Sequence, residues 1–320
     1  MWSRPYALER APDLPPDMLS MMLPAERDVL FSIAKNYCVG AGDIIDAGVF
    51  LGASTHCFVR GLEQNPRGTG RIHAYERAII GRPLAKLRPD LGRPKDNYSD
   101  QLRAILSRIG GDVELHIGDI LEADYRGTVE VLFLDIMKQR ETFRKCNALF
   151  MGKLIPGHSL VIQQDHYWPM NWYIAAYMQL LEDYFTIVDR AETSCIFLNT
   201  KALPAEVVNH DPLDGLSSAQ IVALLDRARD TGTTPFQVMM MELCVAAYGM
   251  QSGNPAITES RLAEFEAKFD PSLRQTSPRV VALHRRLRGL YQQGSDPTAL
   301  SWAPRKTQES EATAAAPPPL

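Results

Sequence analysis

The turn between a predicted strand and a predicted helix reads Asp46-Ala47-Gly48-Val49-Phe50-Leu51-Gly52-Ala53-Ser54-Thr55. The residues before it, Asp43-Ile44-Ile45, form a short apolar run that predicts a buried strand, and residues 53–62 predict the following helix. Gly48 and Gly52 allow a ligand to approach the backbone closely, while the helix N-terminus, Ser54 and Thr55 offer donors to a carboxylate or phosphate. The stretch therefore predicts a cofactor-binding turn.

The spacing of the glycines argues against a dinucleotide cofactor. Gly48 and Gly52 are separated by three residues, and Gly40 and Gly42 come before the strand. The three-glycine fingerprint of dinucleotide-binding folds is therefore not met. A nicotinamide-dependent oxidoreductase stays as a disfavoured alternative.

The composition describes an ordinary globular protein. The chain has 320 residues, 45% hydrophobic residues and a formal net charge of −4, so nothing in the charge balance indicates a nucleic-acid partner. Its five cysteines are scattered, which favours a reducing, cytoplasmic location. The N-terminus lacks the apolar core of a signal peptide, and the longest apolar stretch, 238–250, is too short to cross a membrane.

Strand and helix patterns alternate through the first two thirds of the chain. Strands are expected near residues 43–45, 71–76, 113–118, 129–135, 158–164, 185–189 and 194–199, with helices at 24–39, 53–62, 97–109, 141–151 and 171–184. Three prolines discourage a helix over the basic segment 77–95. The pattern predicts an α/β fold, a doubly wound, mostly parallel seven-stranded sheet with an antiparallel last strand.

The strand pattern stops after about residue 203, and the organisation changes there. Residues 1–24 form an N-terminal extension, 25–202 the ligand-binding domain, 203–302 a C-terminal helical region with apolar stripes, and 303–320 a tail predicted to be disordered. The sequence leaves the oligomeric state open, with a homo-oligomer as one alternative.

Acidic residues stand where several predicted strands end. Glu76 ends the second strand, Asp119 the third and Asp135 the fourth, and Gln164-Asp165-His166 end the fifth. Ligands of doubly wound sheets bind at this edge, where an acid after the second strand can accept hydrogen bonds from a ribose. A single such acid is usually a helix cap, but a set at successive strand ends favours a ligand site.

The glycine turn resembles the first motif of class I S-adenosylmethionine-dependent methyltransferases, which have a Rossmann-like methyltransferase fold. Asp135-Ile136-Met137-Lys138, followed by Leu154-Ile155-Pro156-Gly157 and another strand, looks like the catechol O-methyltransferase pattern and also resembles the macrocin O-methyltransferase and cephalosporin-hydroxylase-like families. The resemblance implies an S-adenosylmethionine site formed by Asp46, Gly48, Gly52, Ser54, Thr55, Glu76, Asp119 and Asp135.

The same resemblance implies a metal and a base. Asp135, Gln164 and Asp165 match the positions that hold Mg²⁺, an ion that prefers oxygen ligands. Lys138 matches the position of the base that removes the proton of the acceptor hydroxyl, and His166, titratable near neutrality, is the alternative base.

The sequence thus predicts an S-adenosylmethionine-dependent O-methyltransferase that acts on a hydroxyl of a small molecule of the sugar or natural-product type, with Mg²⁺ assistance left open. The catechol enzymes carry an acid followed by an amide at the fifth strand, whereas this chain has Gln164 before Asp165. That difference motivates the alternative of a non-catalytic, methyltransferase-like binding or assembly module.

Overall fold

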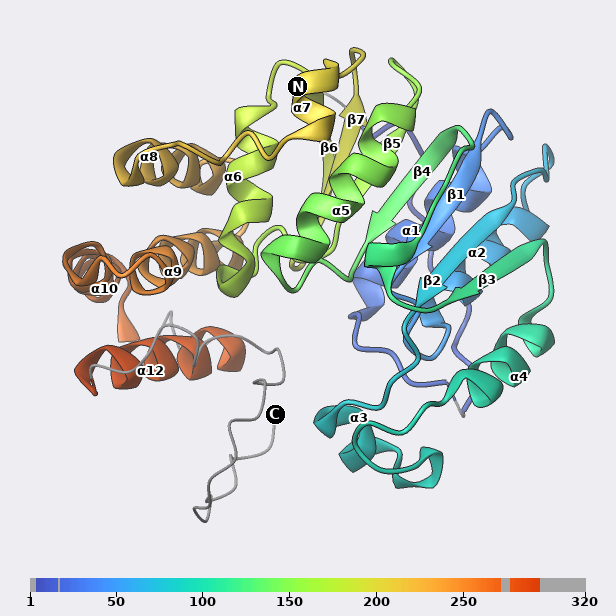
Figure 1. The fold of residues 1–320 in the computed structure, drawn as a ribbon, viewed down its shortest axis with the longest axis horizontal. Coiled ribbons are helices and arrows are strands. Elements are labelled where there is room, and N and C mark those ends of the chain that lie inside the picture. Colours follow the sequence, from blue (N-terminus) through green and yellow to red (C-terminus); the bar gives the residue numbers. More distant parts are fainter. Residues whose placement is uncertain (1–3, 17, 272–276, 294–320) are drawn as a thin grey trace.

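A seven-stranded sheet forms the centre of the protein, which we describe from a computed structural model covering residues 4–16, 18–271 and 277–293 (Figure 1). The strand order is β3-β2-β1-β4-β5-β7-β6. The strands are β1 (Asp43–Ala47), β2 (Ile72–Glu76), β3 (Val113–Ile117), β4 (Val129–Leu134), β5 (Leu160–Gln163), β6 (Phe185–Ala191) and β7 (Ser194–Asn199). Strands β1 to β5 pair in parallel, and β7 is antiparallel to both of its neighbours. The predicted sheet is confirmed.

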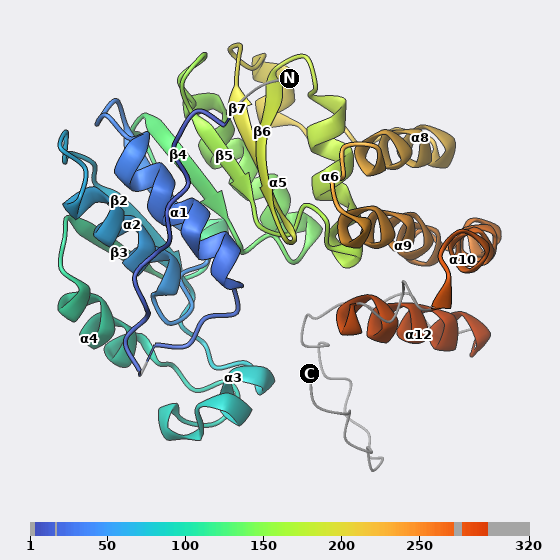
Figure 2. The same cartoon turned by 180° about the vertical axis from the view of Figure 1, so that it is seen from behind.

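Helices cover both faces because the inner strands are apolar on both sides. On one face lie α1 (Pro24–Asn36), α2 (Ala53–Glu63) and α4 (Ser99–Ile109), and on the other lie α5 (Arg140–Phe150) and α6 (Trp172–Leu180) (Figures 1 and 2). Side chains alternate along a strand, so Ile44 and Ile45 enter different hydrophobic clusters, one under each helical layer.

Short helical turns complete the connections. The 3₁₀ turns are η1 (Pro89–Leu91), η2 (Ile120–Glu122), η3 (Met151–Lys153) and η4 (Pro169–Asn171). The prediction that 77–95 lacks a helix is wrong in part, because α3 (Arg82–Leu87) lies within it. Pro83 falls in the first turn of α3, where the missing N–H of proline costs no intrahelical bond.

The C-terminal region consists of α7 (Ala205–Asn209), α8 (Ser218–Arg229), α9 (Pro235–Gln251), α10 (Pro255–Lys268) and α12 (Pro278–Gln292). The predicted apolar stripes are buried, including Ile221, Leu262 and Val280. Their cluster also contains side chains of β4 and α6, so these helices share one hydrophobic core with the sheet. The tail predicted to be disordered, 303–320, lies outside the described residues.

The N-terminal extension is tied to the sheet. Arg4 Nε and Nη2 donate to the carboxylate of Asp189 on β6 at 2.5 and 2.8 Å, and the Tyr6 hydroxyl donates to it at 2.7 Å. Burial raises the pKa of Tyr6 above its ordinary value. Within the described ranges, no helix is long and apolar enough to span a membrane.

Candidate active site

The glycine turn after β1 has the backbone that its sequence requires. Gly48 and Gly52 have φ angles of 108° and 87°, and Phe50 between them has a φ of 52°. A Cβ on Gly48 would lie 2.7 Å from Ile136 Cγ2 and 2.9 Å from the carbonyl carbon of Asp135, so glycine lets this turn close onto the segment after β4. A Cβ on Gly52 would lie 3.2 Å from Leu106 Cδ2 of α4. The bare side of Gly52 therefore faces a packed helix and not the open edge of the sheet.

Asp46 organises the start of α2. Its carboxylate is fully buried and accepts hydrogen bonds from Ser54 Oγ at 2.9 Å and Thr55 Oγ1 at 2.6 Å. The expectation that these two hydroxyls are free donors for a ligand is corrected, because a buried carboxylate requires them. Burial raises the pKa of Asp46 to about 6. Its second oxygen, Oδ1, is buried without a hydrogen-bond partner among the described residues.

Glu76 ends β2 beside the same turn. Its carboxylate accepts the backbone N–H of Phe50 at 2.8 Å and that of Ala78 at 3.0 Å. Burial raises the pKa of Glu76. Each carboxylate oxygen can accept a further bond, so Glu76 can hold the turn and receive a ribose hydroxyl as well. Asp119 at the end of β3 is exposed and accepts the Leu121 N–H at 3.0 Å, as the cap of η2.

A charged triad lies where β4 and β5 end. Lys138 Nζ donates to Asp135 Oδ1 at 2.6 Å and also to Asp165 Oδ2, which in addition accepts Asn171 Nδ2 at 3.0 Å. Burial opposes the charge on the ammonium, but the two carboxylates outweigh it and raise the pKa of Lys138. The amine is therefore protonated at neutral pH. The prediction of Lys138 as the base stays a prediction; in this structure its ammonium is held by two carboxylates, and a base must first lose its proton.

The electrostatics of Asp135 differ from those of an ordinary surface carboxylate. Burial raises the pKa of Asp135 above its usual range, Lys138 opposes that rise, and Asp165 adds to it. The Asp135 N–H donates to the Ala47 carbonyl at 2.8 Å, which fixes the triad against the glycine turn. A carboxylate whose pKa is raised in this way can accept a proton more readily than an ordinary surface carboxylate.

Gln164 does not join Asp135 and Asp165. Its side chain is buried, donates from Nε2 to Glu26 Oε1 of α1 at 3.0 Å, and accepts from Ser194 Oγ at 2.7 Å. Glu26 accepts hydrogen bonds from both Gln164 and Ser194, and burial raises the pKa of its carboxyl. Both polar ends of the Gln164 amide are used inside the protein, so in this structure Gln164 is not directed at the position predicted for Mg²⁺.

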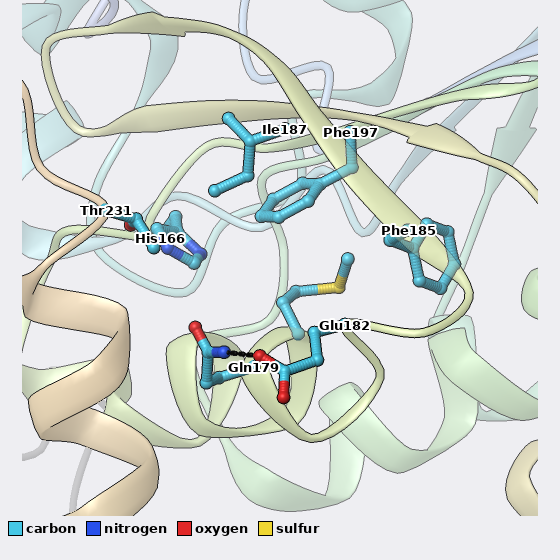
Figure 3. A pocket seen from close by; sticks show the side chains of 8 residues that line it. His166, Gln179, Glu182, Phe185, Ile187, Phe197 and Thr231 are labelled. Carbon is cyan, nitrogen blue, oxygen red and sulfur yellow. Dashed lines mark hydrogen bonds between the residues drawn. The ribbon is translucent and has the colours of Figure 1, made fainter. Parts of the chain in front are cut away.

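His166 lines a cavity of about 230 Å³ together with Ile187, Phe197 and Thr231 (Figure 3). Burial lowers the pKa of His166 to about 3, and neither ring nitrogen has a hydrogen-bond partner within the described part of the chain. The expected role of His166 as the alternative base stays a prediction; in this structure its ring is buried and lines the cavity.

The aromatic residues after β5 pack rather than line the edge. Tyr167 is fully buried, and Tyr173 is buried with its hydroxyl donating to the Met137 carbonyl at 2.9 Å. Trp172 donates from Nε1 to Gln251 Oε1 of α9 at 2.9 Å. The sequence did not identify Asn171 and Glu26, because neither belongs to a motif. Asn171 acts on nearby Asp165, whereas Glu26 contacts Gln164 through a long-range hydrogen bond.

The strand order, the parallel pairing of β1 to β5 and the antiparallel β7 together define a Rossmann-like methyltransferase fold. No protein-family model and no curated protein matches this chain. Among solved structures it is similar to the O-methyltransferase NovP, with 13% identity over 59% of this chain and 85% of that chain and a TM-score of 0.47. It is also similar to the N-methyltransferase NodS from Bradyrhizobium japonicum WM9, with 12% identity and a TM-score of 0.34. The match covers 55% of this chain and 95% of NodS.

Proposed function

We propose that this protein is an S-adenosylmethionine-dependent O-methyltransferase whose acceptor is a hydroxyl of a small molecule. The observation that carries the proposal is the Asp135, Lys138 and Asp165 triad, which adjoins the glycine turn at the carboxyl edge of the sheet. Ligands of doubly wound sheets bind at this edge. In this proposal the glycine turn holds the cofactor, and the adjoining triad provides a group that can take a proton.

The residues at the turn fit the cofactor. Glu76 retains acceptor capacity for the ribose hydroxyls. Asp46 Oδ1 has no hydrogen-bond partner among the residues that the structure describes, and it would accept from a cationic amino group. Asp119 is exposed at the end of β3, where the adenine would lie in this proposal. Gly48 keeps the backbone free of a side chain at the closest approach to Asp135.

When bound, the cofactor would supply an electrophilic methyl group from its sulfonium sulfur, which would be left as a neutral thioether. The acceptor hydroxyl forms the new carbon–oxygen bond with its own lone pair, and Asp135 takes the proton that the hydroxyl loses. Lys138 stays protonated throughout and offers its ammonium to the oxygen as negative charge develops there. Asp165 and Asn171 hold Lys138 in position for this role.

The predicted donor set does not fit a Mg²⁺ ion. Gln164 is turned toward Glu26 and Ser194, and the Lys138 ammonium takes the position between the two carboxylates. We therefore assign the proton transfer and the charge stabilisation to the side chains of the chain itself.

The proposal is tested by calorimetry with S-adenosylhomocysteine and NAD. S-adenosylhomocysteine should bind, and Glu76→Gln should weaken it by about 1.5–3 kcal/mol, the typical contribution of hydrogen bonds to a charged group. Glu206→Gln, an exposed change on α7, is the matched control and should bind as wild type does. Binding of NAD alone would replace the proposal with the oxidoreductase alternative.

A further inference from the structure

Two histidines and a glutamate meet on one face of the sheet, away from the carboxyl edge. His73 lies on β2, and Glu114 and His116 lie on β3. The parallel register pairs His73 with Glu114 and Tyr75 with His116, so all four side chains point to the same face. One ligand atom from each of His73, Glu114 and His116 lies within 4.8 Å of the others.

The separations match those of ligands around one tetrahedral ion. His73 Nδ1 lies 3.0 Å from His116 Nε2, and the Glu114 carboxylate lies 3.7 Å from the former through Oε2 and 3.6 Å from the latter through Oε1. Ligands bound to zinc at 2.0–2.1 Å in tetrahedral geometry stand about 3.4 Å apart. Little side-chain movement would therefore bring the three groups onto one ion.

The residues that contact His73 and His116 also resemble those around a metal site. His73 Nε2 lies 3.2 Å from Asp43 Oδ2, and the Tyr125 hydroxyl donates to the same oxygen at 2.8 Å. A carboxylate at this position keeps the proton of His73 on Nε2 and leaves the Nδ1 lone pair directed at the cluster. Tyr75 stacks on His116 with ring centroids 4.4 Å apart, which restrains that ring too.

Glu114 also forms an ion pair at the surface. Its Oε2 lies 3.6 Å from Arg71 Nη1, and both side chains are about half exposed. A surface pair of this kind contributes little stability, so it yields readily to a metal bond.

We propose that His73, Glu114 and His116 bind one Zn²⁺ ion, with water as the fourth ligand on the exposed side. Two imidazoles and one carboxylate form a donor set suited to zinc and unsuited to Mg²⁺ or Ca²⁺. Because β3 is an edge strand, the ion would fasten it to β2. The inference is independent of the proposed methyl transfer, since the ligands lie in different parts of the fold from Asp135 and Lys138.

The test is zinc titration by calorimetry of the full chain, after removal of any purification tag and treatment with a chelator. One equivalent of Zn²⁺ should bind, and Co²⁺ in its place should give the absorption bands of four-coordinate cobalt. His116→Asn and Glu114→Gln should each weaken zinc binding by at least about 100-fold, and Asp43→Asn by about 10–100-fold. His210→Ala, an exposed histidine on a distant segment, is the control and should leave the affinity unchanged.

Either of two results would overturn the zinc site. Wild-type affinity in both His116→Asn and Glu114→Gln would show that any zinc binds elsewhere. Loss of zinc binding in Asp135→Asn, with no loss in Glu114→Gln, would move the ion to the carboxyl edge. If His116→Asn does not fold, Glu114→Gln decides the question alone, because the Glu114 side chain is 48% exposed and its change does not disturb the core.

Discussion

The two polar clusters on the sheet differ in whether they contain their own cation. At the carboxyl edge, Asp135 and Asp165 share the ammonium of Lys138. On β2 and β3, two imidazole nitrogens face each other at 3.0 Å, and the carboxylate of Glu114 stands beside them. The first cluster contains its own cation, whereas in the second the two imidazoles share a hydrogen bond, whose proton an external cation would replace in our proposal. We therefore propose different roles for clusters with similar separations between polar atoms: proton transfer at the carboxyl edge and metal binding on β2 and β3.

The largest effect should come from removing the base from the cluster at the carboxyl edge. Asp135→Asn keeps the shape of the side chain but cannot accept the hydroxyl proton, so we expect kcat to fall by about 10²–10⁴-fold. S-adenosylhomocysteine affinity should change little. The measurement is methyl transfer to a panel of phenols, sugars and phosphorylated acceptors, followed as S-adenosylhomocysteine release.

Asp165→Asn is the matched variant, because it removes the other carboxylate that holds Lys138. Its rate loss should be smaller than that of Asp135→Asn. Equal losses would show that the two carboxylates act as one unit. Wild-type protein that binds the cofactor tightly but methylates nothing in the panel would favour the non-catalytic alternative.

A smaller and pH-dependent effect should follow from removing the cation. Lys138 opposes the rise in the pKa of Asp135, so Lys138→Met should raise that pKa further. The base works only when deprotonated, and the rate therefore rises with pH through this pKa. We expect the acidic limb of the pH–rate profile to move to higher pH by about 1–3 units, the range for losing an opposite charge at this distance.

The shape of the pH–rate profile distinguishes a Lys138 that only supplies positive charge from a Lys138 that acts as the base. If Lys138 positions charge, the Lys138→Met rate recovers toward wild type at high pH, and Lys138→Arg restores the original limb. If Lys138 were the base, the loss would persist at every pH and arginine would not rescue it.

Local patterns in the sequence predicted the sheet and most helices because the apolar periods of those segments agree with their tertiary burial. The glycine turn was also predictable, since its positive φ angles at Gly48 and Gly52 require that residue. The side-chain partners were not. Ser54 and Thr55 were expected to face a ligand, yet the complete burial of Asp46 directs them inward. Nothing near Gln164 in the sequence shows that Glu26, on a distant helix, takes its amide.

The histidine cluster shows the same limit more clearly. His73 is 41 residues from Glu114 in the chain, and only the register between β2 and β3 brings them together. Metal motifs recognisable in a sequence have short, regular ligand spacing, as on one helix or in one loop. A site built across two strands has no such spacing, so pairing had to be known before the ligands could be identified.

The smallest expected effect is that of zinc removal on methyl transfer, and it tests most directly whether the two clusters have different roles. A chelator that strips zinc from His73, Glu114 and His116 should leave methyl transfer at the wild-type rate, because Lys138 supplies the cation at the carboxyl edge. Thermal unfolding in the same samples should shift on adding Zn²⁺, since an ion that binds only the folded state stabilises it, and the shift should vanish in Glu114→Gln. If chelation stopped turnover, and Mg²⁺ but not Zn²⁺ restored it, the ammonium of Lys138 would have to give way to a metal between Asp135 and Asp165, and the contrast between the clusters would fail.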